Sequence, residues 1–194
     1  MKRILIQCAA ILALSGAAVA EEWTLNGDAS RLAFGSVKKD TVGEIHEFQS
    51  MTGTVKDGMA DIQIDLTSLE TYADIRNTRM AEHVFKMAPS ASFSAGLDMD
   101  MLGAMAVGDT DVIDFDGVLS YLGQDVEVFA ELIVARMTEE RVMGTTNDMV
   151  WVSTEELGIE AGIDTLKELA ELSSISRAVP VTVRLVFDRA GASS

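Results

Sequence analysis

The chain has 194 residues, a net charge of −16 and a hydrophobic content of 48%. This length suits one domain that buries about 70% of the surface of its unfolded chain. The strong negative charge repels phosphate backbones and excludes nucleic acid as an expected partner. Cys8 is the single cysteine, so we expect no disulfide framework and no thiolate metal site.

Residues 1–20 have the layout of a secretory signal peptide. Lys2 and Arg3 precede a short apolar run, and the sequence AVA ends at Ala20. A membrane anchor is the alternative, but a spanning helix needs ~20 apolar residues. We therefore expect cleavage after Ala20, a periplasmic location and no stable insertion in the membrane. Residues 21–194 would form one domain with a net charge of −18, because Lys2 and Arg3 leave with the signal.

Alternation of apolar and polar residues predicts strands along most of the chain. In 60–66 every second residue is apolar, with Asp61, Gln63 and Asp65 between them, and 179–188 repeats the pattern. Both segments are typical of half-buried strands. We expect these residues to face inward: Ile62, Ile64, Leu66, Val181, Val183 and Leu185. Further predicted strands are 30–39, 91–100, two strands in 111–137 around a turn at 122–125, and 141–153, bent near Gly144.

Two segments are predicted to be helical, 75–85 and 160–172. The second carries an apolar stripe and ends before Ser173 and Ser174. Many short strands with turn signals between them indicate an antiparallel sandwich or barrel. The sequence therefore predicts an all-β fold with two short helices.

The sequence lacks the common catalytic patterns. It contains no nucleophile elbow, phosphate-binding glycine loop, haem-attachment motif or zinc-protease helix. His46 and His83 each lie beside glutamate, so a metal site of two histidines and one carboxylate is an alternative. A lone histidine is more often a hydrogen-bonded structural residue. We expect no catalytic residue, no metal and no cofactor.

Several short motifs occur in a fixed order over nearly the whole of residues 21–194. The positions that carry them in 64–93 are Ser68, Leu69, Thr71, Arg76, Arg79, Met80, Phe85, Pro89 and Phe93. Three other segments contribute: 23–34, 45–55 with Phe48 and Gly53, and the hairpin at 116–128. This succession resembles the YceI family of exported, lipocalin-like barrels that bind polyisoprenoid or other long apolar molecules.

The resemblance implies an antiparallel lipocalin-like β-barrel of about eight strands. It also implies binding, storage or transport of a long apolar isoprenoid-type lipid, either polyisoprenoid or quinone-like, in the barrel interior. A quinone-like ligand would suggest a membrane redox protein as a partner, by analogy with the ligand class. The residues expected to contact the lipid are Phe34, Phe48, Ile62, Ile64, Met80, Phe85 and Phe93.

The resemblance implies that residues 68–85 of this chain form a short helix across the end of the barrel. We expect Phe85 to point inward with one or more of Ile75, Met80 and Val84. Arg76 and Arg79 share a helix face. We expect them to pair with local acids rather than with a ligand head group, the candidates being Glu70, Asp74 and Glu82.

The chain departs from the family pattern at two places. Asn77 stands where the family often has aspartate. Residues 155–176 replace a short turn and add the second predicted helix. Because of this insertion, the family pattern does not define the shape of the cavity mouth in this chain.

Two other functions remain alternatives. A cofactor-free, histidine-dependent or metal-dependent enzyme could act on an apolar substrate in the same cavity. It would use His46 or His83 as a base and predicts a histidine with a perturbed pKa at the cavity wall. A barrel filled by its own side chains could instead serve as a protein-interaction module with an exposed apolar patch. The methionines and aromatic residues suit either a filled core or a ligand-binding lining.

Overall fold

The structure is a computed structural model that describes residues 22–191. The expected signal peptide at 1–20 lies outside the described residues. The described part forms a twelve-stranded sheet in which every pairing between strands is antiparallel. The strands are β1 (Trp23–Leu25), β2 (Arg31–Lys38), β3 (Val42–Phe48), β4 (Met51–Lys56), β5 (Met59–Asp65), β6 (Leu69–Glu70), β7 (Ser90–Gly96), β8 (Thr110–Tyr121), β9 (Gln124–Thr138), β10 (Arg141–Thr146), β11 (Val150–Ser153) and β12 (Ala178–Arg189). The helices are α1 (Asp74–Arg79), the π-helix η3 (Met80–Val84), α2 (Met99–Ala104), α3 (Glu160–Leu169) and the short 3₁₀ turns η1 (Gly27–Ala29) and η2 (Leu66–Ser68).

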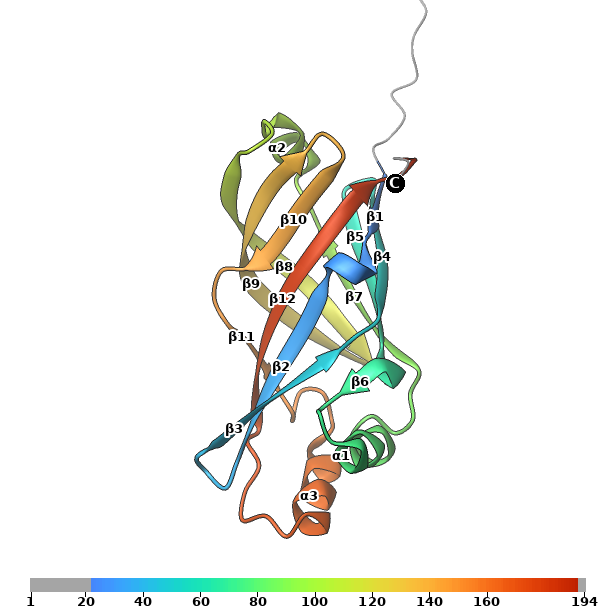
Figure 1. Cartoon of the computed structure of the whole chain (residues 1–194), viewed down its shortest axis with the longest axis vertical. Coiled ribbons are helices and arrows are strands. Elements are labelled where there is room, and N and C mark those ends of the chain that lie inside the picture. The colour runs from blue at the N-terminus through green and yellow to red at the C-terminus, as the bar shows by residue number, and fades with distance from the viewer. Residues whose placement is uncertain (1–21, 192–194) are drawn as a thin grey trace, which may run out of the picture.

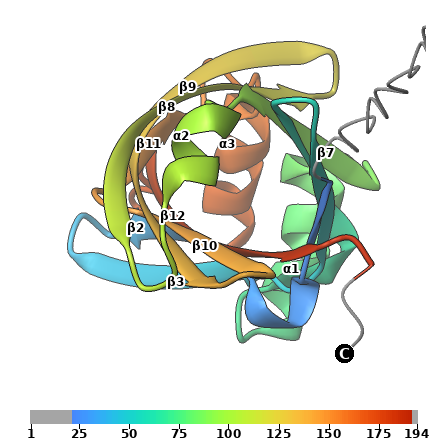
Figure 2. The same ribbon diagram turned by 90° about the horizontal axis from the view of Figure 1, so that it is seen from above.

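Eight of the strands close into a barrel. Strand β1 joins the two ends of the sheet, because Trp23 pairs with Val55 of β4 and with Arg189 of β12. The ring runs β1-β4-β5-β7-β8-β9-β10-β12 and back to β1, and Figure 2 looks down onto it. The predicted antiparallel barrel of about eight strands is confirmed.

The remaining strands extend the wall at one end of this ring. The first half of β12 pairs with β2 on one side and with β11 on the other, and β3 and β6 continue the sheet beyond β2. Figure 1 shows the β2–β3 hairpin at the lower end, together with α1 and α3, while α2 covers the upper end. The two ends of the barrel are therefore built from different elements.

Burial confirms the predicted register of the two most regular strands. Ile62 and Ile64 of β5 are buried, whereas Asp61 and Gln63 are exposed. On β12, Leu185 is buried, and Val181 and Val183 line the interior with it. Leu66, just after β5, is buried as well. Period-two alternation thus places the apolar face of each strand inward.

Several predicted boundaries differ from the structure, and the helix expected at 160–172 ends at Leu169. The strand expected at 91–100 ends at Gly96, because Asp98 caps α2 by accepting a hydrogen bond from the Met101 amide at 3.0 Å. The segment 141–153 forms two strands rather than one bent strand. The helix expected at 75–85 is α1 followed by the π-helix η3. Within the described residues, no helix is both long enough and apolar enough to cross a bilayer.

Candidate functional site

The barrel contains a cavity of about 490 Å³. This volume falls within the ~300–1,000 Å³ usual for small-molecule sites. Its walls come from the inward faces of ten strands, and α1, η3 and α3 close its lower end. Apolar side chains dominate the lining, so the cavity suits a molecule that is itself mostly apolar.

All seven residues expected to contact a ligand lie on the cavity wall. The structure brings together Phe34, Phe48, Ile62, Ile64, Met80, Phe85 and Phe93. They come from five elements and from the loop after η3, so the barrel closure unites positions that are far apart in the chain. Their contact with a ligand stays a prediction.

A chain of aromatic rings lines the lower half of the cavity. The rings of Phe34 and Phe48 stack with centroids 5.3 Å apart. Phe85 meets Phe48 edge-on at 5.5 Å and Tyr121 edge-on at 6.4 Å. Such arrangements stabilise aromatic pairs beyond the burial of their area. They give this part of the wall a fixed shape.

A second aromatic pair marks the upper limit of the cavity. Phe93 and Phe115 stack with centroids 5.4 Å apart, and Phe115 also lines a smaller upper cavity of about 80 Å³. Gly117 makes this packing possible, since a Cβ there would lie 2.1 Å from Cζ of Phe93. The Phe93 ring thus occupies the space that a side chain at 117 would need.

The helices at the lower end pack closely on one another. Gly162 of α3 lies so near η3 that an added Cβ would be 2.2 Å from the carbonyl oxygen of His83. The Tyr121 hydroxyl donates a hydrogen bond to the carbonyl oxygen of Val84 at 3.1 Å and ties η3 to β8. Ile163 and Leu166 of α3 line the cavity. The insertion at 155–176 therefore supplies part of the closed end.

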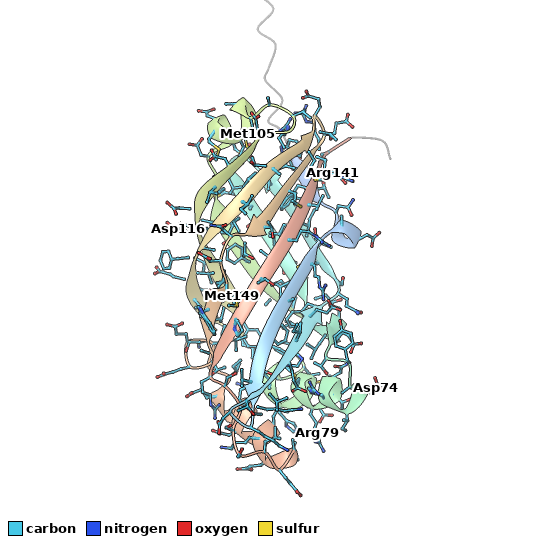
Figure 3. All side chains as sticks on the ribbon, turned by 60° about the vertical axis from the view of Figure 1, so that its left-hand side comes forward. Asp74, Arg79, Met105, Asp116, Arg141 and Met149 are labelled. Carbon is cyan, nitrogen blue, oxygen red and sulfur yellow. The ribbon has the colours of Figure 1, made fainter. Side chains whose placement is uncertain are left out.

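The two arginines of α1 have other partners than the sequence suggested. Arg76 pairs with Glu44 of β3, with 2.9 Å between Nη2 and Oε1. Arg79, which Figure 3 places at the lower end, donates a hydrogen bond to the carbonyl oxygen of Leu169 on α3 at 3.2 Å. The predicted partners Glu70, Asp74 and Glu82 are thus wrong for both contacts. The arginines join α1 to β3 and α3, which are remote in sequence.

Asn77 has a structural role near the start of this region. Its side-chain oxygen accepts hydrogen bonds from the amide and the hydroxyl of Thr71, at 2.9 and 2.6 Å. A carboxylate oxygen would accept the same two bonds. Asparagine can therefore replace the family's aspartate without loss of this contact.

One stretch of the cavity wall is polar, and the sequence analysis did not identify it as such. Ser36, Lys38, Glu44 and His46 all line the cavity from β2 and β3. Nζ of Lys38 lies 2.7 Å from Oε1 of Glu44, the same oxygen that Arg76 contacts. Burial raises the pKa of Glu44, but the hydrogen bond from Lys38 and the charge of Arg76 together hold that pKa below its usual value. This carboxylate is therefore ionised at neutral pH.

His46 is the most deeply buried polar group on that wall, with 2% of its surface exposed. Its Nε2 lies 2.9 Å from Oγ of Ser36, and its ring packs against Phe34 at 5.2 Å. Burial and the nearby charge of Arg76 lower its pKa from 6.5 to about 4, against the opposing effect of Glu44. The imidazole is neutral at pH 7.

His83 has a different environment. It is half-exposed on η3, and its Nε2 lies 3.8 Å from a carboxylate oxygen of Glu82. It does not line the cavity that holds His46. Over residues 22–191, no group of three or more histidine, cysteine or acidic side chains is placed to hold a metal ion.

The neutral, buried His46 predicts a specific pH dependence of stability. Its folded pKa lies below the unfolded value, so the unfolded chain takes up a proton first as the pH falls. The free energy of unfolding should decrease between pH 6.5 and about 4, by about 3 kcal/mol from this group. Urea unfolding measures the free energy of unfolding of the wild type and of His46→Phe across this pH range. Subtracting one curve from the other cancels the titration of the carboxylates, which both proteins share. Parallel curves for the two proteins would contradict the prediction.

The fold and the cavity define a class of protein, a closed antiparallel barrel with an apolar ligand cavity. Comparison with solved structures identifies a polyisoprenoid binding domain from Saccharophagus degradans implicated in plant cell wall breakdown. It has 32% sequence identity and a TM-score of 0.84, over 86% of this chain and 98% of that domain. BcnA of Burkholderia cenocepacia shares the fold, with 19% identity and a TM-score of 0.65 over 84% of this chain and 98% of BcnA.

The chain belongs to the YceI-like family of lipocalin-like barrels. Family models, in contrast, give no match to the sequence. A search of curated proteins gives none either.

Proposed function

We propose that this protein is a periplasmic carrier or store for a long apolar lipid of the isoprenoid type, held inside the barrel. The apolar cavity of about 490 Å³ is the observation that carries the proposal. The similarity to a polyisoprenoid binding domain supports the same ligand class. The signal-like layout of residues 1–20 supports export.

Burial of the lipid chain supplies enough free energy for this function. Each methylene removed from water contributes about 0.8 kcal/mol, so ten of them contribute roughly 8 kcal/mol before the costs of association. The cavity offers contacts to such a chain from the Phe34–Phe48 stack to the Phe93–Phe115 stack. Binding therefore needs no covalent chemistry.

The enzyme alternative is weaker, although its prediction of a perturbed histidine at the cavity wall is met by His46. A general base works best when its pKa is near the operating pH. The pKa of His46 is instead lowered to about 4, so this side chain accepts a proton poorly at pH 7. We propose that the protein is not an enzyme.

The filled-barrel alternative requires a solid interior. The cavity contradicts that requirement. Phe129 and Trp151 are exposed on the outer wall, as a protein-interaction module would need, but single exposed apolar residues are common on protein surfaces. A quinone-like ligand would extend our proposal to a membrane redox protein as the partner that loads or empties the cavity.

Filling the cavity should abolish lipid retention. Ala130 of β9 lines the cavity, so Ala130→Phe would place a ring in the space for the lipid chain. Ala135 lies on the same strand, in the alternate register that faces outward, and Ala135→Phe is the matched control. We expect native mass spectrometry to find co-purified lipid on the wild type and on Ala135→Phe, and at least tenfold less on Ala130→Phe. Equal occupancy in the two folded variants would contradict binding in this cavity.

A further inference from the structure

The cavity wall formed by β2 and β3 changes from apolar to polar along its length. Side chains on every second position of both strands face the cavity, and the antiparallel register sets them in pairs. From the middle of the barrel towards the hairpin tip, the pairs are Leu32 with Phe48, Phe34 with His46, and Ser36 with Glu44. A ligand with an apolar chain and a polar end fits this wall in one direction only, with its polar end near the hairpin.

The position of His46 at this transition leaves one hydrogen-bonding atom without a partner. Nε2 contacts Ser36, whereas Nδ1 is buried and has no hydrogen-bond partner among the described residues. A buried polar atom left unpaired costs about 1–3 kcal/mol, and most such atoms in folded proteins are paired. Because the imidazole lines the cavity, a polar group of the ligand can supply the missing bond.

The two cations nearest His46 are already paired with a carboxylate of the protein. Lys38 and Arg76 both contact the same carboxylate oxygen of Glu44, at 2.7 and 2.9 Å. Arg79 is engaged with the carbonyl oxygen of Leu169. A phosphate would therefore have to displace Glu44 from its cations or lie against its negative charge. An uncharged head group meets neither obstacle.

A hydroxyl matches His46 better than a carbonyl does. If Nε2 carries the proton and donates to Ser36, Nδ1 is an acceptor and needs a donor from the ligand. If Ser36 donates to Nε2, Nδ1 carries the proton and needs an acceptor. A hydroxyl can act in either way, whereas a carbonyl complements only the second tautomer.

We propose that the cavity binds its lipid with the polar end between β2, β3 and α1, and that this end is an uncharged hydroxyl hydrogen-bonded to Nδ1 of His46. The inference rests on the proposed lipid-binding function and defines the class of ligand as a long-chain alcohol. The chain of the alcohol then runs up the barrel towards Phe93 and Phe115.

Three ligands with the same geranylgeranyl chain test this assignment: the alcohol, the hydrocarbon that lacks the oxygen, and the monophosphate. Each is titrated into the lipid-free protein, into His46→Phe and into His83→Gln, with displacement of a fluorescent lipid as the measurement. The chain has two histidines, and His83 lies outside the cavity, so His83→Gln is the matched control. The comparison of variants isolates the head group from the chain that all three ligands share.

We expect His46→Phe to weaken the alcohol about tenfold and to leave the hydrocarbon within about twofold, as for the loss of one hydrogen bond. His83→Gln should bind all three ligands as the wild type does, and the monophosphate should bind the wild type more weakly than the alcohol. In ¹⁵N spectra of the wild-type imidazoles, the alcohol should shift Nδ1 of His46.

A monophosphate that binds more tightly than the alcohol would overturn the inference. Equal weakening of alcohol and hydrocarbon in His46→Phe, or an unshifted His46 signal in the wild type, would do the same. In each of those cases the lipid-binding function still stands. Failure of all three ligands to bind the folded wild type would instead overturn the proposed function itself.

Discussion

Replacing Gly162 with alanine should open the lower end of the barrel, although alanine favours a helix over glycine by about 1 kcal/mol. A Cβ at this position would lie 2.2 Å from the carbonyl oxygen of His83 and 2.9 Å from Cα of Val84. Both are backbone atoms, so α3 must move away from η3. We expect the free energy of unfolding to fall by about 2 kcal/mol, as for an overpacked core. Bound lipid should also dissociate faster, because Ile163 and Val84 line the cavity on the two sides of this contact.

Gly103→Ala provides the control. Gly103 lies in α2 at the opposite end of the barrel, and a Cβ there would meet no heavy atom within 4 Å beyond its chain neighbours and the backbone of its own helix. Its replacement should be neutral or stabilising through helix propensity. Chemical denaturation and the rate of lipid release compare the two variants. If Gly162→Ala were as stable as Gly103→Ala, the close approach of α3 to η3 would not be a determinant of the closed end.

The regular strands could be predicted from the sequence because their apolar residues face the interior and their polar residues face water. On β5, Ile62 and Ile64 face the interior and Asp61 and Gln63 face water. The alternation of apolar and polar residues in the sequence therefore matches the alternation of buried and exposed side chains on β5. On β12 the alternate positions Val181, Val183 and Leu185 likewise line the interior. The two strands together indicated a sheet with an enclosed face.

Strand β3 escaped prediction because its pattern is inverted. His46, with 2% of its surface exposed, and Glu44 face the cavity, while Ile45 between them is 63% exposed on the outer face. A prediction based on the rule that apolar residues face the barrel interior does not identify a strand in this stretch. Local sequence rules are expected to fail at functional sites. The inversion in β3 therefore marks the polar end of the cavity.

The partners of Arg76 and Arg79 could not be predicted from the local sequence either. Acids close in the chain were the natural candidates, but the ion pair of Arg76 with Glu44 spans from α1 to β3. Which residues meet across such a distance is decided by strand register and by the way α1 docks. The residues that the resemblance implied as ligand contacts all line the cavity, whereas the pairing of the charged groups at its end depends on the tertiary structure.

Replacing Trp23 with alanine should cause the largest loss of stability at the opposite end of the barrel. Trp23 is 4% exposed in β1, the strand that joins β4 to β12 and closes the ring. The guanidinium groups of Arg136 and Arg189 lie over its ring, 5.1 and 5.2 Å from the centroid. We expect a cost of about 3–5 kcal/mol in unfolding free energy, since the change leaves a large void and removes both cation–π contacts. Thermal and urea unfolding measure it.

The chain has one other tryptophan, which makes the control direct. Trp151 of β11 is 62% exposed on the outer wall, so Trp151→Ala should change stability by less than about 1 kcal/mol. Trp23 lines the small upper cavity and not the main one. Trp23→Ala should therefore keep its lipid below its lowered melting temperature, in contrast to Gly162→Ala. Equal stability losses in the two tryptophan variants would show that β1 does not hold the ring closed through Trp23. Lipid loss from folded Trp23→Ala would show that the two ends of the barrel are not independent.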